Sequence, residues 1–474
     1  MTKKNSKKVS LGHVPMLLLW VVVLGLTAVR LLVACSGSLG ESEALILVCA
    51  IHPAGGYVEG PCGVPLLADL LLAGKGLFGG APLLALRWLS PIAILLLSWC
   101  VWKISRKIAP HRPAVALWSV LGINLLPWVN VASGVMDGAV VTASLILLSI
   151  VAGWNAVDSV GAKVRKGKHP PSTLLPWTLF GVTLGLSTLF AYSIGWLLPC
   201  AIGAHLFLHR EKSLPIRGIL MALSFLLLGW IFPLIWNSRY DWIQWSSVAR
   251  GFDCYPIGGF TYSLSLCVAL SALLVPALVN LASSALWWRR GMIALLIGMS
   301  LLSALVLVMP SMLPPSLPSP LGVQGVAELA RIVLSLQKER LDAKYAKSFL
   351  IAQSSGLAAL LEAKITITYP ERPGTPSVFV AESPSLNSSY ALWPSYADAV
   401  TPAAKDINYT EEFISPFLGR NALYITSESK QELPQTITGA FGAVGLLKEM
   451  TITKNGQPET IRIYQCDNYR SLSL

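Results

Sequence analysis

Residues 36–65, SGSLGESEALILVCAIHPAGGYVEGPCGVP, follow the first strongly hydrophobic stretch of the chain. This acidic segment, as we name it, holds Glu41, Glu43 and Glu59, three of the few acids in the first 310 residues. Ionised carboxylates are costly in hydrocarbon, so acids beside a membrane segment are candidates for a functional role. We interpret the acidic segment as the carboxylate wall of a site at the membrane surface.

The composition is that of a membrane protein with a soluble tail. Hydrophobic residues make up 54% of the chain and charged residues 13%, with a mean hydropathy of +0.61; a soluble chain carries roughly a quarter charged residues. Residues 311–474 hold 14 Lys+Arg and 15 Asp+Glu, which leaves 22 and 9 for residues 1–310. The net charge of +12 therefore resides in the apolar region and does not indicate a nucleic-acid partner. We find no RNA-binding motif, no Walker loop and no dinucleotide fingerprint beyond a weak glycine pattern at 439–445.

Apolar stretches of about 20 residues mark helices that can span a bilayer. We count nine, at roughly 14–34, 82–102, 114–133, 138–155, 173–190, 193–209, 218–236, 260–286 and 291–310. The first is too long for the core of a signal peptide, so we expect it to be retained. The fold class is therefore a polytopic α-helical membrane protein of about nine spans, followed by a soluble α/β domain.

Every second connection is basic, namely residues 3–8, 103–112, 163–168, 210–217 and 289–290. By the positive-inside rule, residues 1–13 form a cytoplasmic basic N-terminus. Residues 14–310 form the transmembrane domain with an outer loop at 35–81, and the tail lies outside. Residues 64–78 are apolar but short and contain Asp69 and Lys75, so we predict an interfacial helix there.

The tail begins with a proline-rich linker at 311–323, and residues 324–474 form the extracytoplasmic α/β domain. Helical periodicity covers 322–341 and 355–363, where charges such as Glu328 and Arg331 are interpreted as a solvated face. Strands are predicted at 349–353, 364–370, 377–383 and 421–428, and a closing hairpin at 450–466 that turns at Asn455-Gly456.

The acids of the acidic segment fall in two settings. Glu41 and Glu43 are two residues apart, so on a helix they diverge by about 200° and only one can face a given pocket. Glu59 lies in AGGYVEGP, where the glycines and Pro61 predict a turn. A carboxylate near a membrane surface can have a raised pKa and act as a general base. The alternative is that these are solvated loop acids or charges at a helix N-terminus.

A second group of candidates ends the seventh span, in WNSRYDWIQWSSVARGFD at 236–253. Its tryptophans are typical of a membrane-interface belt. Arg239 and Arg250, however, lie on the side where the positive-inside rule disfavours them. Because arginine binds phosphate through paired hydrogen bonds, this pair predicts a lipid phosphate or pyrophosphate ligand.

Other polar residues have a structural alternative. Asp137 at the outer end of the fourth span is a candidate site residue or a helix N-cap. His205 and His209 are four residues apart, but an interfacial role is favoured over a metal site. Four cysteines on the predicted outer side could form a disulfide or stay isolated thiols: Cys35, Cys49, Cys62 and Cys254. No metal-ligand spacing occurs, and no cofactor is predicted with certainty; a divalent metal stays open.

Several elements follow one another in a recognisable order: GESEAL (40–45), GGYVEGPC (55–62), Phe78-Gly79, Arg87, Asp137, WNSRYDW (236–242) and Arg250-Gly251. This ordered set resembles the membrane glycosyltransferases of the C-type fold. It is most similar to the bacterial group that includes dolichyl-phosphate-mannose–protein mannosyltransferase-like and lipid A aminoarabinose transferase-like enzymes.

The resemblance implies an inverting transferase in the cell (inner) membrane. It would take a sugar from a polyprenyl-phosphate donor and pass it to a glycan, lipid or protein acceptor at the outer face. Glu43 or Glu41 would deprotonate the acceptor, and Glu59 would orient or assist. Arg250 and Arg239 would hold the leaving phosphate. The residues implied in substrate binding are Tyr57, Asp137, Asn237 and Trp242.

Some positions depart from the family pattern. Ser42 stands where the family has its first aspartate, and Gly60 and Cys62 replace a histidine and a proline. Ala191 stands where a lysine is common. A second hypothesis is therefore a relative without activity that binds lipid-linked glycan or scaffolds an assembly. A transporter is the third hypothesis, but apart from Arg30 the spans carry almost no charge at mid-membrane.

Overall fold

The computed structural model describes residues 13–73, 86–136, 138–161, 174–208, 214–244, 258–282, 322–339, 347–368, 377–382, 388–397, 417–428, 432–454 and 457–470, together with 291, 295, 298–299 and 301–302. The chain divides into two compact units. The helical unit comprises Met1–Cys35, Leu86–Ile231 and Thr261–Met309, and the sheet unit comprises Ser36–Ala85, Phe232–Phe260 and Pro310–Leu474. The acidic segment thus belongs to the same unit as the C-terminal tail.

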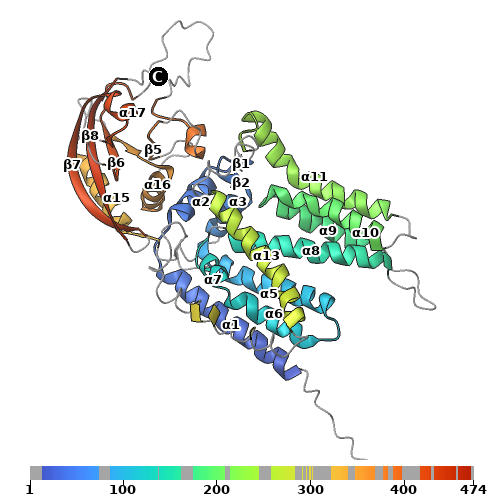
Figure 1. Ribbon diagram of the computed structural model, residues 1–474. Helices are drawn as coiled ribbons and strands as arrows, with labels where there is room; N and C mark the ends of the chain where they lie inside the picture. Colours follow the sequence, from blue (N-terminus) through green and yellow to red (C-terminus); the bar gives the residue numbers. More distant parts are fainter. Residues whose placement is uncertain are drawn as a thin grey trace, which may run out of the picture. The chain divides into compact units, whose positions relative to one another are not determined.

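The helical unit is built from apolar helices (Figure 1). In chain order they are α1 (His13–Ser36), α5 (Leu89–Ile108), α6 (Pro113–Leu125), α7 (Pro127–Ser133), α8 (Ala139–Gly161), α9 (Leu174–Thr188), the 3-10 helix η2 (Tyr192–Trp196), α10 (Leu197–Leu208), α11 (Ile216–Arg239) and α13 (Gly258–Ala282). The end of α11 belongs to the sheet unit. Each of the first eight predicted spans overlaps one or more of these helices.

Among the described residues, four helices are long and apolar enough to cross a membrane: α1, α5, α8 and α11. The pair α6 and α7 makes a fifth if it counts as one span bent by 62°. Other apolar helices, such as α9 with 15 residues, are shorter. The chain therefore has the helices of a membrane protein. The count of about nine spans stays a prediction, since the ninth segment lies mostly outside the described residues.

The bend between α6 and α7 is held by a buried arginine from α1. Pro127 has no N–H to donate to the carbonyl oxygen of Ile123, which instead accepts from the N–H of Leu126 at 3.4 Å. Arg30, 1% exposed, donates from Nη2 to the carbonyl oxygen of Asn124 at 2.8 Å and from Nη1 to its Oδ1 at 2.9 Å. Its Nε and Nη2 also donate to Asn130 Oδ1 at 2.9 and 2.7 Å. The guanidinium thus joins Asn124 and Asn130, one on each side of the bend.

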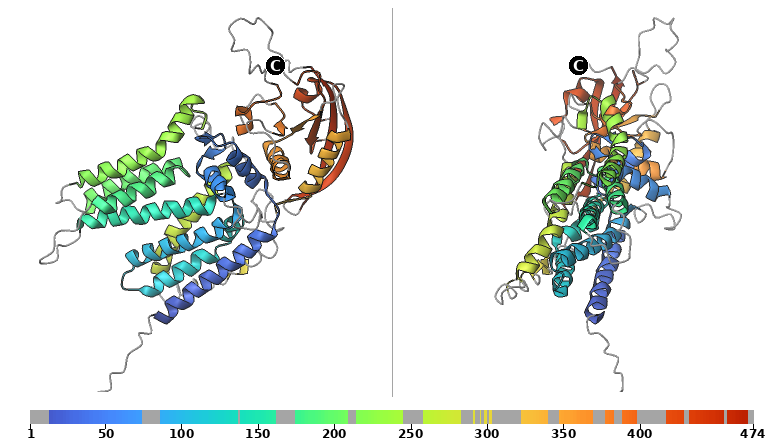
Figure 2. Two further views of the ribbon diagram at one scale, coloured as in Figure 1. Left: turned by 180° about the vertical axis from the view of Figure 1, so that it is seen from behind. Right: turned by 90° about the vertical axis from the view of Figure 1, so that its right-hand side faces the viewer.

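Helices α9 and α11 approach closely because glycine lies at their contact. A Cβ on Gly185 would lie 2.3 Å from the carbonyl oxygen of Phe225, and one on Gly229 would lie 2.2 Å from that of Gly185. Two helix backbones can approach this closely only where neither residue carries a side chain. Helices α8, α9 and α11 run side by side in both Figure 1 and Figure 2.

The C-terminal tail forms a six-stranded sheet in the order β3-β7-β8-β6-β4-β5. Its strands are β3 (Val323–Gln324), β4 (Phe349–Ala352), β5 (Phe379–Val380), β6 (Ala422–Thr426), β7 (Phe441–Lys454) and β8 (Gln457–Tyr469). Strand β4 pairs in parallel with β5 and β6, and the other pairs are antiparallel. The helices α15 (Val326–Glu339) and α16 (Ser355–Thr368) lie on the concave side of the long β7–β8 hairpin (Figure 2).

The expected α/β tail is confirmed, with one exception. The predicted strands at 349–353, 377–383 and 421–428 overlap β4, β5 and β6. The hairpin is confirmed by the pairing of Lys454 with Gln457, although Asn455 and Gly456 lie outside the described residues. The strand predicted at 364–370 is wrong, because α16 continues to Thr368. Its run of Ile and Thr prolongs a helix that buries Leu360, Leu361 and Ile365, so packing outweighs the β preference of these residues.

The acidic segment has its own secondary structure. It contains α2 (Glu41–Ile51) and a short hairpin of β1 (Gly56–Tyr57) and β2 (Gly60–Pro61); α3 (Gly63–Ala73) begins in it. Helix α2 packs on α16, and the N–H of Val323 donates to the carbonyl oxygen of Leu39 at 3.0 Å. The acidic segment is therefore folded onto the sheet domain.

Candidate functional site

Glu43 closes the N-terminus of α2. Its Oε2 accepts a hydrogen bond from the N–H of Gly40 at 3.0 Å, the reciprocal contact of a capping box. Its side chain is completely buried. The prediction that Glu41 and Glu43 diverge on a helix is confirmed, since Glu43 binds the N–H of Gly40 and Glu41 binds Lys454.

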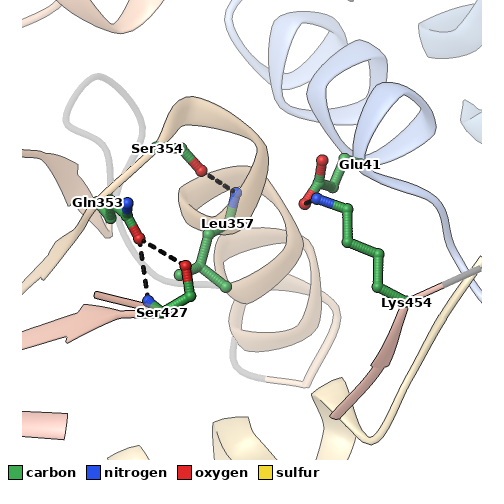
Figure 3. Close-up of polar contacts among 6 residues, drawn as sticks. All are labelled: Glu41, Gln353, Ser354, Leu357, Ser427 and Lys454. Carbon is green, nitrogen blue, oxygen red and sulfur yellow. Dashed lines mark hydrogen bonds and ion pairs between the residues drawn. The ribbon is translucent and has the colours of Figure 1, made fainter. Parts of the chain in front are cut away.

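Glu41 forms an ion pair with Lys454 at the end of β7, with 2.7 Å between Oε1 and Nζ (Figure 3). It also lies against the first turn of α16, where a Cβ on Gly356 would be 3.0 Å from Glu41 Cδ. The positive end of the helix dipole favours a carboxylate there. About a quarter of the Glu41 side chain, 26%, stays exposed.

Figure 3 also shows how α16 begins. The side-chain oxygen of Ser354 accepts a hydrogen bond from the N–H of Leu357 at 3.3 Å, as an N-cap does. The neighbouring Gln353 Oε1 accepts from the N–H of Ser427 at 3.0 Å and from its hydroxyl at 3.1 Å. These contacts join the ends of β4 and β6 to the helix that faces Glu41.

The β1–β2 hairpin carries Tyr57 and Glu59. The Tyr57 hydroxyl donates to the carbonyl oxygen of Cys49 at 2.8 Å and accepts from the N–H of Ala54 at 2.9 Å. Tyr57 is only 2% exposed. Its hydroxyl therefore fixes the loop between α2 and the hairpin, and its predicted contact with substrate stays a prediction.

Glu59 lies in the turn of this hairpin and binds Ser389, 330 residues along the chain. Its Oε1 accepts from the N–H of Ser389 at 2.8 Å, and its Oε2 accepts from the hydroxyl. Burial raises the pKa of the Glu59 carboxyl, while the two hydrogen bonds from Ser389 oppose that rise because they stabilise the ionised form. The sequence offered no signal for this contact.

A second buried acid, Glu362, lies on α16. It is 2% exposed and accepts from the Tyr390 hydroxyl at 2.8 Å and from the N–H of Ser377 at 3.3 Å. The His52 Nε2 atom lies 3.8 Å from its Oε1. The prediction that charges on the tail helices are solvated holds for Glu328 and Arg331 but is wrong for Glu362, because the acidic segment covers that face of α16.

The two acids affect the titration of their neighbours. Burial raises the pKa of the Cys49 thiol well above its usual value, and the carboxylates of Glu59 and Glu362 raise it further. Burial first, and then Glu362, raise the pKa of the Tyr390 hydroxyl. Both groups therefore stay protonated near neutral pH. His52, Glu362, Ser389 and Tyr390 are site-adjacent residues that sequence reasoning missed.

The end of α11 packs against the glycines of the hairpin. A Cβ on Gly56 would lie 2.9 Å from the Trp236 ring, and one on Gly55 would lie 2.9 Å from the carbonyl oxygen of Phe232. Asn237 is fully buried, and its Nδ2 donates to Gln244 Oε1 at 2.7 Å. The glycines that predicted the turn thus also allow the end of α11 to pack closely against the hairpin.

Of the other predicted residues, the structure describes Arg239, Trp242 and Arg87. Arg239 is exposed at the end of α11, and Trp242 is 42% exposed with a positive φ of 56°. Arg87 is buried and donates to the carbonyl oxygen of Ala34 at 3.1 Å. Several predictions lie outside the described residues: those for Asp137, His209, Trp245, Arg250 and Cys254.

Cys35, Cys49 and Cys62 are free thiols. Within the described ranges, no group of three or more His, Cys, Asp or Glu side chains is arranged to hold a metal ion.

Comparison with known proteins gives a distant structural likeness. No family model matches the chain, and no curated protein matches it. Two solved structures are similar over nearly the whole chain. ArnT from Cupriavidus metallidurans bound to undecaprenyl phosphate has a TM-score of 0.49 at 11% identity, covering 94% of this chain and 97% of that one. Its apo state has a TM-score of 0.43 at 12% identity, covering 95% and 97%.

Proposed function

We propose that this chain is a membrane glycosyltransferase. It moves a sugar from a polyprenyl-phosphate donor to a glycan, lipid or protein acceptor at the outer face of the cytoplasmic membrane. The observation that carries this proposal is the hairpin carboxyl of Glu59, held by Ser389 with a raised pKa, in a chain whose motif order resembles that of C-type-fold transferases.

The reaction is a direct displacement. The acceptor hydroxyl oxygen forms a bond to the anomeric carbon, and the bond from that carbon to the phosphate oxygen breaks with inversion. The hydroxyl proton passes to a carboxylate, and the electron pair of the broken bond stays on the phosphate. Cations opposite the carboxylates would stabilise that charge as it develops, which is the role we assign to Arg250 and Arg239.

The surroundings of the three acids divide their proposed roles. A general base has to reach the acceptor proton and works best with a pKa near the operating pH. Glu41 has an exposed face and Glu59 has a raised pKa, so each has one of these properties. Glu43, buried against Gly40, would shape the start of α2 and so place Glu41.

A deletion strain tests this function. Envelope glycans would be compared by mass spectrometry after complementation with the wild type, with Glu41→Gln plus Glu43→Gln, or with Glu59→Gln, at equal protein level. We expect the glycan lost on deletion to return with the wild type and not with either of these variants. Glu328→Gln, an exposed acid of α15, is the matched control and should restore it. Full restoration by both carboxamide variants would refute the carboxylate assignment.

The phosphate contact has a separate test. Arg250→Ala and Arg239→Ala should weaken binding of polyprenyl phosphate to the purified protein in detergent, whereas Arg331→Ala, exposed on α15, should not. Unchanged binding in both variants would remove that role.

A second candidate function is binding of a lipid-linked glycan without transfer. It is favoured by one observation: every acid of the acidic segment already has a protein partner, namely Gly40, Lys454 or Ser389. In that case the wild type would bind polyprenyl phosphate, and deletion of the gene would remove no single glycosyl linkage. The two assays above therefore separate the candidates.

A further inference from the structure

We propose that Gln244 is a positioning residue for the Glu59 carboxyl, acting through the backbone of the hairpin that carries it. The importance of this role for catalysis rests on the proposed function. Gln244 lies just beyond α11 and is 3% exposed.

The Gln244 amide forms hydrogen bonds to both ends of the turn. Its Nε2 donates to the carbonyl oxygen of Tyr57 at 2.5 Å and to that of Gly60 at 2.7 Å. These residues are paired opposite each other in the hairpin, with Val58 and Glu59 between them. Gly60 has a positive φ of 153°, which glycine adopts readily, so the turn depends on both a glycine and this amide.

Asn237 fixes the orientation of the Gln244 amide. Its Oε1 accepts from Asn237 Nδ2 at 2.7 Å, and the same Nδ2 donates to the carbonyl oxygen of Pro233 at 2.9 Å. The Gln244 NH₂ group must therefore face the hairpin. A carboxylate at this position could not donate to either carbonyl oxygen.

The chain also bends back to bring Gln244 to this place. Asp241 and Trp242 both have positive φ, 49° and 56°, a conformation that is unfavourable for residues other than glycine. The N–H of Trp242 donates to the carbonyl oxygen of Asn237 at 2.9 Å. Two consecutive residues in this region persist only where surrounding contacts hold them, and the Asn237–Gln244 contact is one.

Ser389 holds the other side of the same turn. Its hydroxyl oxygen accepts from the N–H of Val58 at 3.0 Å and donates to Glu59. The turn is thus held between an amide on its carbonyl groups and a serine on its side chain. Loss of the Gln244 amide would let the turn relax and the carboxyl of Glu59 reach water.

Thermal unfolding of the full chain in detergent between pH 4.5 and 8 provides the test. Because burial raises the pKa of Glu59, the free energy of unfolding should fall as pH rises from the unfolded pKa through the folded one. Glu59→Gln removes that fall, so the difference in Tm between Glu59→Gln and wild type should grow with pH.

The same difference is then measured in a Gln244→Ala background. Positioning by Gln244 predicts that it no longer grows with pH, because the released carboxyl titrates near its ordinary value. Ser238→Ala is the control, since this exposed hydroxyl bonds only within α11, to Ile235 at 2.9 Å. If Gln244→Ala does not fold, Gln244→Asn keeps the amide but shortens its reach, and a smaller loss is expected.

A purely structural role would lower Tm equally at every pH and leave the Glu59 difference intact, and that result would overturn the inference. The measurement needs no substrate. If deletion of the gene removes no glycan but Gln244→Ala still abolishes the pH-dependent difference, the proposed function fails and the positioning role stands.

Discussion

Lys454 Nζ lies 2.7 Å from Glu41 Oε1, so the last residue of β7 is joined to the first residue of α2. The two side chains are 38% and 26% exposed. Solvent therefore screens the pair, and its contribution to stability is limited to about 0.2–1 kcal/mol. The ion pair matters because it engages Glu41, one of the two acids, with Glu59, that we propose as the proton acceptor.

Replacement of either partner should separate these two roles. Lys454→Met should reduce stability slightly, with an effect that shrinks in 0.5 M salt, and should leave glycan transfer intact. Glu41→Gln should show the same small loss of stability but also lower transfer. Thermal unfolding at low and high salt, with the envelope glycan profile, checks both. Equal loss of transfer in the two variants would mean that the pair, rather than the carboxylate, matters.

Ser389→Ala should raise the pKa of Glu59 further, because one hydrogen bond to the ionised carboxylate is lost while burial remains. A raised folded pKa gives stability that is present at low pH and is lost as pH rises through it. The variant also loses the contact with the N–H of Val58 at every pH, so its deficit relative to the wild type should be smaller near pH 4.5 than at pH 8. Unfolding curves across this range test the sign, and Ser335→Ala, an exposed serine of α15, is the control.

Gly185→Ala should destabilise the helical unit, because the new methyl group would lie 2.3 Å from a backbone oxygen of α11. Overpacking of this kind costs about 1–3 kcal/mol. Gly203→Ala on α10 meets nothing within 4 Å and should be neutral or slightly stabilising. Thermal unfolding of both proteins in one detergent gives the comparison, and equal melting temperatures would show that α9 and α11 can separate without cost.

Arg30→Lys should also destabilise the helical unit although it keeps the charge. An ammonium group cannot reproduce the planar fork that binds Asn124 and Asn130. Loss of hydrogen bonds to a charged group costs about 1.5–3 kcal/mol. Leu32→Ala on the same helix, at a side chain that is 72% exposed, should have little effect on the melting temperature. A melting temperature unchanged by Arg30→Lys would contradict the role of the guanidinium.

The predicted orientation can be tested by labelling in intact cells. Cys466 is a poor reporter because it is buried and its pKa is raised to about 12. Gln457→Cys, at an exposed position of β8, should react with a membrane-impermeant maleimide. Lys8→Cys should react only after lysis. The reverse pattern would place the C-terminal sheet in the cytoplasm.

Local sequence patterns predicted the elements better than the contacts between them. Apolar stretches located the helices, and the glycines and Pro61 of AGGYVEGP predicted a turn where the β1–β2 hairpin lies, because these signals act within a few residues. The same logic failed at 364–368, where Ile and Thr favour a strand but the packing of α16 extends the helix.

The candidate site was predicted by position rather than by partner. The divergence of Glu41 and Glu43 follows from helix geometry, whereas the contact of Glu59 with Ser389 joins residues 330 apart. Glu362 was missed for the same reason. Its helix face resembles a solvated one in the sequence, and it is buried because α2 packs on α16. Gln244 carries no charge and matches no motif, so nothing in the sequence distinguished it.

Arg30 of α1 has a consequence for the synthesis and membrane insertion of the protein. Its partners lie 94 and 100 residues further along the chain. At about 5–20 residues per second, the ribosome needs roughly 5–20 s to supply them. During that interval the first helix carries an arginine without its partners, which opposes insertion by about 2.5–3.5 kcal/mol at a helix centre. The apolar residues of α1 can offset this cost, so the arginine is expected to gain its hydrogen bonds only after the Asn124–Asn130 region has followed α1 into the membrane.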